Sequence, residues 1–214
     1  MILSELVTAA HVAYKGNLRV PAVGTDKFRI YASIANRKQR EWATDPYVDW
    51  TSLYQEASVG TVTPTSRTYD LDDEVIRAAE YVYLSKDGQL HNVELIHPRE
   101  ANNVYGNAAF ISKKTVTFVN DIPTQYAGAT LIVPAYYMPE DLVNPNDEVS
   151  VDNPDWLVYA LAAELARNDY SKDDQFPNLQ GMASEIYDRM RSANEELAYL
   201  QNSTVPVITE NMGI

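Results

Sequence analysis

The chain has 214 residues, of which 45% are hydrophobic and 22% charged, a composition typical of a globular protein with a buried core. It has no cysteine, which excludes disulfides, thiolate metal sites and a cysteine nucleophile. Its net charge of −13 argues against a protein that grips nucleic acid through a basic surface. The sequence contains no apolar run of about 18 residues and therefore predicts no membrane span.

Residues 2–14 are expected to form a first helix, because apolar side chains recur there at helical spacing. Ser4 could cap the start of this helix, and Gly16 follows it as an end signal. A loop over 17–25 then leads to the next element.

A second helix is predicted from Thr25, a typical cap residue, to about residue 43, before Pro46. Three basic side chains on this helix stand out in an acidic chain, namely Lys27, Arg37 and Arg40. They form either a solvated face or a docking face for an acidic partner surface.

From about residue 50 to 138 the apolar pattern shifts to a period of two, which indicates short strands separated by Gly, Pro, Asn and Asp. The predicted strands are 50–58, 60–65, 75–85, 93–98, 108–114, 115–120 and 129–138. A turn is expected at 86–88. This succession favours a small antiparallel sandwich or barrel over a parallel sheet.

The stretch 154–169 predicts a helix that is apolar on nearly all sides. An acidic, proline-rich connector, 139–154, precedes it. Asn153 is expected to cap the helix, Pro154 to occupy its first turn, and only Glu164 to interrupt its apolar run. Such a helix must be covered on most sides, so we expect it at the centre of a small bundle.

A long last helix is expected from about 177 to 201. Its predicted apolar seam consists of Leu179, Met182, Ile186, Met190, Ala193, Leu197 and Leu200. The two C-terminal helices form an αα-hairpin, on which the N-terminal pair can pack to give a four-helix core. The residues assigned to that core are Trp156, Tyr159, Leu161, Leu165, Ile186 and Met190.

The sequence thus predicts an α+β fold in three parts. Residues 1–48 and 152–201 form the helical bundle, and residues 49–151 form an inserted antiparallel β-sandwich or barrel with the acidic connector. Residues 202–214 are either a frayed terminus or an extended C-terminal arm that adds to a neighbouring sheet edge. The contact residues expected on this arm are Val205, Pro206, Val207, Ile208 and Ile214.

Patterns that carry chemistry are missing from the sequence. His11, His91 and His97 lack the spacing of a zinc-binding helix. The acidic run 69–75 resembles the lead-in to a strand more than a pair of carboxylates held across a cleft. The eight glycines are scattered and form no phosphate-binding loop. We therefore expect no catalytic site, no metal site and no cofactor.

Four segments, taken in order, resemble a known family. They are 41-EWATDPYVDW-50, 70-DLDDEVIRAAEYVY-83, 115-TVTFVNDIPTQYAGATLIVPAYYMPEDL-142 and 154-PDWLVYALAAELARND-169. Their succession is similar to that of the neck adaptor (head-to-tail connector) proteins of tailed bacteriophages. The resemblance is to the type in which a β-sandwich is inserted into a helical bundle.

This resemblance implies a structural virion protein that forms a homo-oligomeric ring, usually of twelve copies. Such a ring joins the portal protein to the tail or to the next neck component, at the capsid–tail junction. It implies synthesis in the cytoplasm of the host bacterium and no contact with a membrane. DNA passes through the lumen without specific binding, and an acidic bore would repel its phosphates.

Two alternatives remain open at this point. One is another virion component, from a tail tube, a tail terminator or a baseplate, which should lack the long C-terminal hairpin. The other is a carbohydrate-binding or hydrolytic domain, in which Trp42, Trp50 and Tyr54 stack on sugar rings.

Overall fold

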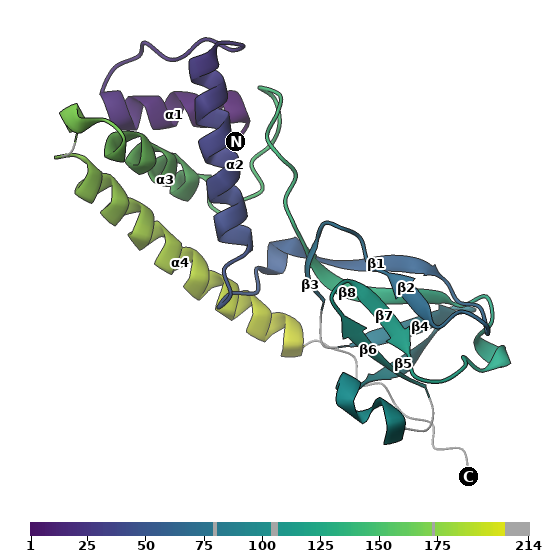
Figure 1. Ribbon diagram of the computed structural model, residues 1–214. Coiled ribbons are helices and arrows are strands. Elements are labelled where there is room, and N and C mark those ends of the chain that lie inside the picture. Colours follow the sequence, from purple (N-terminus) through teal and green to yellow (C-terminus); the bar gives the residue numbers. More distant parts are fainter. Residues whose placement is uncertain (79–80, 104–106, 173, 204–214) are drawn as a thin grey trace. The chain divides into compact units, whose positions relative to one another are not determined.

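The structure is a computed structural model that describes residues 1–78, 81–103, 107–172 and 174–203. The chain divides into two compact units, shown in Figure 1. The helical unit comprises Met1–Ser52 and Pro139–Ile214, and the β unit comprises Leu53–Met138. The expected α+β fold, with a β-sandwich or barrel inserted between helices, is confirmed.

The unit boundaries differ from the predicted ones. Residues 139–151, assigned to the insertion from sequence, belong to the helical unit. The reason is that these residues hydrogen bond to helix α2 (Asp26–Ala43) and to the start of helix α1 (Leu3–Lys15), as described below. The proposed arm, 202–214, lies outside the described residues beyond Ser203.

The described part of the helical unit contains four α-helices. They are α1 (Leu3–Lys15), α2 (Asp26–Ala43), α3 (Pro154–Arg167) and α4 (Phe176–Ser203). The predicted caps of α2 and α3 are present: Thr25 Oγ1 accepts from Phe28 N at 3.3 Å, and Asn153 Oδ1 accepts from Asp155 N at 3.0 Å. At the end of α1, Gly16 adopts a left-handed conformation with φ of 67° and its N–H bonds to Val12 O.

Ser4 does not cap α1, contrary to expectation. The capping position is Ile2, whose N–H donates to Glu5 Oε2 at 3.1 Å. The backbone N–H groups of Leu3 and Ser4 donate instead to the carbonyls of Asp147 and Pro145, both at 2.9 Å. Carbonyls from a distant loop therefore satisfy helix donors that a cap side chain would otherwise serve.

Helix α3 is the centre of the helical unit. It contacts α1, α2 and α4, and Figure 1 shows α2 crossing it while α4 runs alongside. Leu157 and Leu161 on α3 are fully buried. Of the other residues assigned to the core, Trp156 and Met190 are buried, whereas Tyr159, Leu165 and Ile186 are half-buried.

The buried seam of α4 is shifted from the predicted one. The residues that it buries are Leu179, Ala183, Met190 and Asn194, whereas Met182, Ala193 and Leu197 are exposed. The 28 residues of α4 span about 42 Å and the 14 residues of α3 about 21 Å, so α3 covers only part of α4. Apolar residues beyond that contact stay on the surface.

In its described residues, the β unit is one mixed sheet of eight strands that curls towards a barrel. The strands are β1 (Tyr54–Thr61), β2 (Thr68–Asp70), β3 (Val75–Ala78), β4 (Val82–Lys86), β5 (Gln89–Leu95), β6 (Ala108–Ser112), β7 (Thr115–Phe118) and β8 (Thr130–Tyr137). Their order is β1-β8-β4-β5-β6-β7-β2, with β3 also paired to β8. Thr63 N donates to Tyr69 Oη at 3.1 Å, which brings the two edge strands together.

Three features of this sheet differ from the prediction. The expected strand 75–85 consists of two strands, β3 and β4, that pair with successive parts of β8. Strand β2 has no counterpart among the predicted strands, since it overlaps the run 69–75, for which the sequence predicts an acidic lead-in. Strands β5 and β6 run parallel, since a connection that includes the 3₁₀ turn Pro98–Asn103 returns the chain to the same end of the sheet.

Candidate interaction surface and the connector loop

The basic face of α2 is largely engaged inside the helical unit. Arg37 Nη2 lies 2.9 Å from Glu164 Oε1 on α3. Arg40 forms a two-pronged ion pair with Asp141, in which Nε donates to Oδ1 at 3.1 Å and Nη2 to Oδ2. Lys27, near the start of the helix, is exposed. Two of the three predicted docking cations therefore have acidic partners within their own chain.

Glu164 is the polar residue that interrupts the apolar helix. Burial alone would raise the pKa of its carboxyl, but the hydrogen bond from Arg37 and the charge of Lys38 hold that pKa below its usual value. Lys38 Nζ lies 3.7 Å from Glu164 Oε2. The charge of Glu164 is thus compensated, and α2 is fastened to α3 by ion pairs beside the apolar contact.

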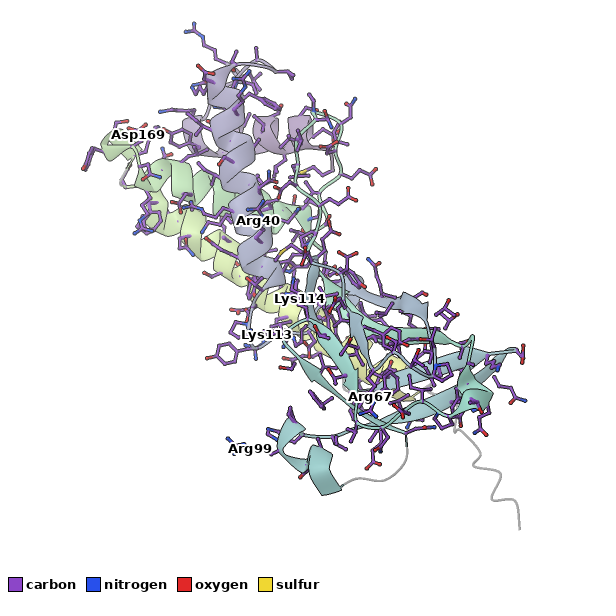
Figure 2. All side chains as sticks on the ribbon, turned by 45° about the vertical axis from the view of Figure 1, so that its right-hand side comes forward. Arg40, Arg67, Arg99, Lys113, Lys114 and Asp169 are labelled. Carbon is purple, nitrogen blue, oxygen red and sulfur yellow. The ribbon has the colours of Figure 1, made fainter. Side chains whose placement is uncertain are left out.

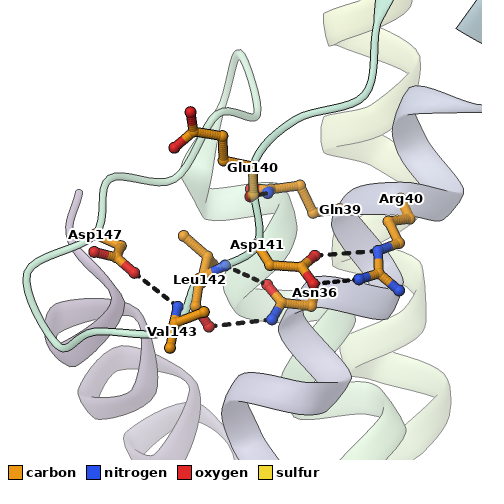
Figure 3. A network of polar contacts seen from close by, with 8 residues as sticks. All are labelled: Asn36, Gln39, Arg40, Glu140, Asp141, Leu142, Val143 and Asp147. Atoms are coloured by element: carbon orange, nitrogen blue, oxygen red, sulfur yellow. Dashed lines mark hydrogen bonds and ion pairs between the residues drawn. The ribbon is translucent and has the colours of Figure 1, made fainter. Parts of the chain in front are cut away.

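The connector loop, residues 139–153, is held against α2 by two amide side chains (Figure 3). Asn36 Nδ2 donates to Leu142 O at 3.1 Å, and Leu142 N donates to Asn36 Oδ1 at 2.8 Å. Gln39 Nε2 donates to Glu140 O at 3.0 Å, and its Oε1 accepts from Ser150 N at 3.1 Å. Each amide therefore supplies a donor and an acceptor to loop backbone that lacks a strand or helix partner.

Asp147 organises the turn of the connector loop. Its Oδ2 accepts from Val143 N at 2.7 Å and from Asn144 N at 2.5 Å, and these bonds lower the pKa of its carboxyl. Its own carbonyl accepts from Leu3 N, as noted above. The loop is therefore a defined structure that links α2 to the first turn of α1.

The other segment that leads to the β unit is held in the same way. Asn194 of α4 is 4% exposed, and its Oδ1 accepts from Thr51 N at 2.8 Å and Thr51 Oγ1 at 3.1 Å. Its Nδ2 donates to Asp49 O at 2.8 Å. Both chain segments that connect the two units are thus fixed to helices by buried amides up to the unit boundary.

A short cluster joins α1 to the end of α3, where Figure 2 labels Asp169. Asp169 Oδ2 accepts from Tyr14 Oη at 2.5 Å and from Lys15 Nζ at 2.6 Å, and its Oδ1 accepts from Ser171 Oγ at 2.6 Å. These contacts, led by that of Lys15, hold the pKa of Asp169 well below its usual range. The cluster keeps α1 in register with the end of the central helix.

His11 is a buried imidazole in the helical unit. It is 2% exposed, and its Nδ1 lies 2.9 Å from Tyr31 Oη. Burial is the main reason why the pKa of His11 is lowered; a contact with Asn17 opposes that shift, and the charge of Lys27 adds to it. Burial also raises the pKa of Tyr31 to about 12, so both rings are neutral near pH 7.

We expect the free energy of unfolding to fall as the pH drops below about 6.5, the value at which an exposed imidazole titrates. Below that pH the imidazole of the unfolded chain binds a proton, whereas the buried imidazole of the folded chain does not. The free energy of unfolding then falls by at most about 1.4 kcal/mol per pH unit, until the pH reaches the pKa of His11 in the folded chain. The pH dependence of this free energy is measured by urea unfolding of the native chain and of a His11→Phe variant, from about pH 8 to about pH 5. The same slope in both would contradict the prediction, and His97→Gln, at an exposed site, is the control.

A groove of about 310 Å³ lies between α2 and α4, over α3. Its floor consists of Trp156, Ala160 and Ala183, all buried. Its polar rim consists of Lys38, Glu41, Gln180, Ser184, Tyr187 and Asp188. An apolar floor within a polar rim is the form of a site that takes up small apolar side chains from a partner.

The outer face of the β unit carries contacting tyrosines. Tyr54 packs edge-on against Tyr136 at 5.7 Å between ring centroids, and Tyr81 stacks on Tyr83 at 6.4 Å. The hydroxyls of Tyr54 and Tyr81 are hydrogen bonded to each other. Burial raises the pKa values of Tyr54 and Tyr83, and these phenols stay protonated.

The stacking of sugar on Trp42 and Trp50 is contradicted by their burial. Each is 1% exposed, and their rings pack against each other at 5.1 Å between centroids inside the helical unit. Trp50 Nε1 donates to Trp42 O at 2.8 Å. These side chains form core and cannot reach a ligand.

Several cations of the β unit bind groups of their own chain. Figure 2 labels Arg67, Lys113 and Lys114 on this unit. Arg67 Nη2 lies 2.7 Å from Asp121 Oδ1, and Lys114 Nζ donates to the carbonyl of Asp73. The Arg67–Asp121 ion pair offsets one of the positive charges that this unit could offer to phosphate groups.

Among residues 1–78, 81–103, 107–172 and 174–203 no group of three or more His, Asp or Glu is placed to hold a metal ion. In the same part of the chain no helix is both long and apolar enough to cross a membrane. Val205, Pro206, Val207, Ile208 and Ile214, predicted as arm contacts, lie outside the described residues.

Residues 3–209 match the model of the SU10 adaptor protein family. The chain belongs to that family. No curated protein matches the chain. Membership makes the chain a structural adaptor of a bacteriophage, found in the virion, with other head or tail proteins as partners. It also implies a structural protein without an enzymatic role.

The sequence interpretation selects Arg37 and Arg40 as partner contacts because they are basic. It does not single out the amides that anchor the two connecting segments, Asn36, Gln39 and Asn194. The signal for Gln39 was present: Phe28, Tyr31 and Trp42 share its face of α2, and a polar residue at that spacing indicates a buried amide.

Proposed function

We propose that the adaptor assembles into a ring, of twelve copies, that joins the portal protein to the tail or the next neck component at the capsid–tail junction. The observation that carries this proposal is the family match, which extends over both units from residue 3 to 209. The long α3–α4 hairpin supports it against a tail-tube, tail-terminator or baseplate role, for which no such hairpin is expected.

The charge of the chain fits the same function. A ring of copies that each carry −13 surrounds its channel with negative potential, which repels phosphate and lets DNA pass without long-lived contacts. DNA then leaves through the lumen and is not bound by sequence. A chain made in the host cytoplasm joins the virion when it meets the portal.

The contact residues are proposed in two places. On α2, Lys27 is exposed and available to an acidic surface of another protein. Arg37 and Arg40 are already paired with Glu164 and Asp141, so they can contact another protein only while they keep or share these ion pairs. Beyond α4, residues 202–214, with Val205, Pro206, Val207, Ile208 and Ile214, form an arm that contacts the portal or a neighbouring copy.

Mixing the chain with its cognate portal protein tests the proposal. The chain alone is expected to be monomeric or weakly associated, and closed rings are expected on the portal by negative-stain electron microscopy and native mass spectrometry. A chain that ends before Asn202 should fold but assemble less well. Failure to bind the portal, or open filaments in place of rings, would overturn the proposed function. Tight DNA retardation at low salt would refute the acidic lumen.

A further inference from the structure

We propose that the groove between α2 and α4 receives part of the arm, residues 204–214, from the neighbouring copy; this inference rests on the proposed ring. The floor of the groove is apolar and solvent reaches it between two helices that both pack on α3. Ser184 and Gln180 are exposed on its α4 rim and can bond to an extended backbone. The groove thus has an apolar floor that can take up side chains and a polar rim that can bond to a peptide backbone.

The composition of the arm suits this groove. Residues 204–214 contain five apolar side chains, Val205, Val207, Ile208, Met212 and Ile214, and a single charged one, Glu210. Pro206 restricts Val205 to extended conformations, which lowers the entropy cost of docking in an extended form. Copies that each carry −13 repel one another, so a nearly neutral segment is the part of the chain best able to cross between them.

The distance along α4 favours a neighbour's groove over the same chain's own. Helix α4 ends at Ser203, and the nearest groove residue on it, Asp188, lies about 22 Å back along the helix axis. To reach the groove of its own copy, the arm would have to run back along α4 and would need about seven extended residues, 204–210, to cover the distance. Val205, Val207 and Ile208 would then span the gap. If the arm instead docks on another copy, these three side chains are free to occupy the groove of that copy.

The absence of cysteine allows a direct test by disulfide trapping in the full chain. One preparation carries Ser184→Cys in the groove rim, and the other carries Val207→Cys in the arm. Mixed on the cognate portal protein under mild oxidation, they should form a disulfide-linked heterodimer at least about tenfold faster than a mixture of Ser192→Cys with Val207→Cys, because docking raises the effective thiol concentration. Ser192 is the matched control, an exposed serine elsewhere on α4.

A chain that carries both Ser184→Cys and Val207→Cys shows whether the arm in a groove comes from the same copy or from a neighbouring copy. Disulfides between copies, formed faster at higher protein concentration, support the proposal, whereas closure within one chain at dilution overturns it. Equal rates at positions 184 and 192 also overturn it. Rings on the portal without the 184–207 disulfide would refute the groove assignment alone. The disulfide without any ring would refute the proposed ring function.

Discussion

Replacement of Leu161 by alanine is expected to lower the free energy of unfolding of the helical unit by about 2–5 kcal/mol. Leu161 is fully buried on α3, which contacts α1, α2 and α4. Ion pairs and hydrogen bonds from Glu164 and the connector loop restrain the surrounding elements. Because these elements cannot collapse into the space left by the side chain, the loss should fall in the upper part of the range.

The measurement is urea unfolding followed by tryptophan fluorescence. All three tryptophans, Trp42, Trp50 and Trp156, belong to the helical unit, so the signal reports on this unit and not on the β unit. Leu197→Ala is the matched control, since Leu197 is 51% exposed on a helix and should change stability by less than about 0.5 kcal/mol. Equal effects of the two substitutions would contradict the central position of α3.

Replacement of Gln39 by leucine is expected to lower the same free energy by about 1–3 kcal/mol. Leucine is of similar size and keeps the packing, but it leaves Glu140 O and Ser150 N without the bonds that Gln39 supplies. Each of these two part-buried hydrogen bonds contributes about 0.5–1.5 kcal/mol. Gln39 is itself only 1% exposed, so water cannot readily replace its amide.

The connector loop gives this variant a second readout. Limited proteolysis should cut the Gln39→Leu variant within 139–153 faster than the native chain, because the loop has lost two of its anchors. Gln180→Leu, at an exposed glutamine on α4, should alter neither stability nor cleavage. If the loop of the Gln39→Leu variant is cleaved no faster than that of the native chain, the anchoring role of Gln39 is wrong.

The helices could be predicted because their signals are local. The cap Asn153, the proline after it and an apolar run interrupted only by Glu164 all lie in one short segment, and they predict this helix at the centre of the bundle. The apolar period of two likewise located most strands of the β unit. In each case the structure is determined by contacts between residues that are close in the sequence, or by the spacing of apolar residues alone.

What escaped prediction depends on partners far away in the sequence. The seam of α4 could not be placed, because only the length of α3 and the position of Thr51 decide that Asn194 is buried and Leu197 is not. The same holds for Arg40, whose partner Asp141 lies 101 residues later. Charge alone suggested a docking face, and it could not reveal that the chain supplies its own counter-ion.

The division of the chain into units has a consequence for folding on the ribosome. The β unit is continuous in sequence, from Leu53 to Met138, whereas α1 and α2 must wait for α3, whose residues are made more than one hundred positions later. The sheet therefore emerges whole while the first two helices still expose their apolar faces. During that interval α1 and α2 are the segments most open to chaperones and to premature self-association.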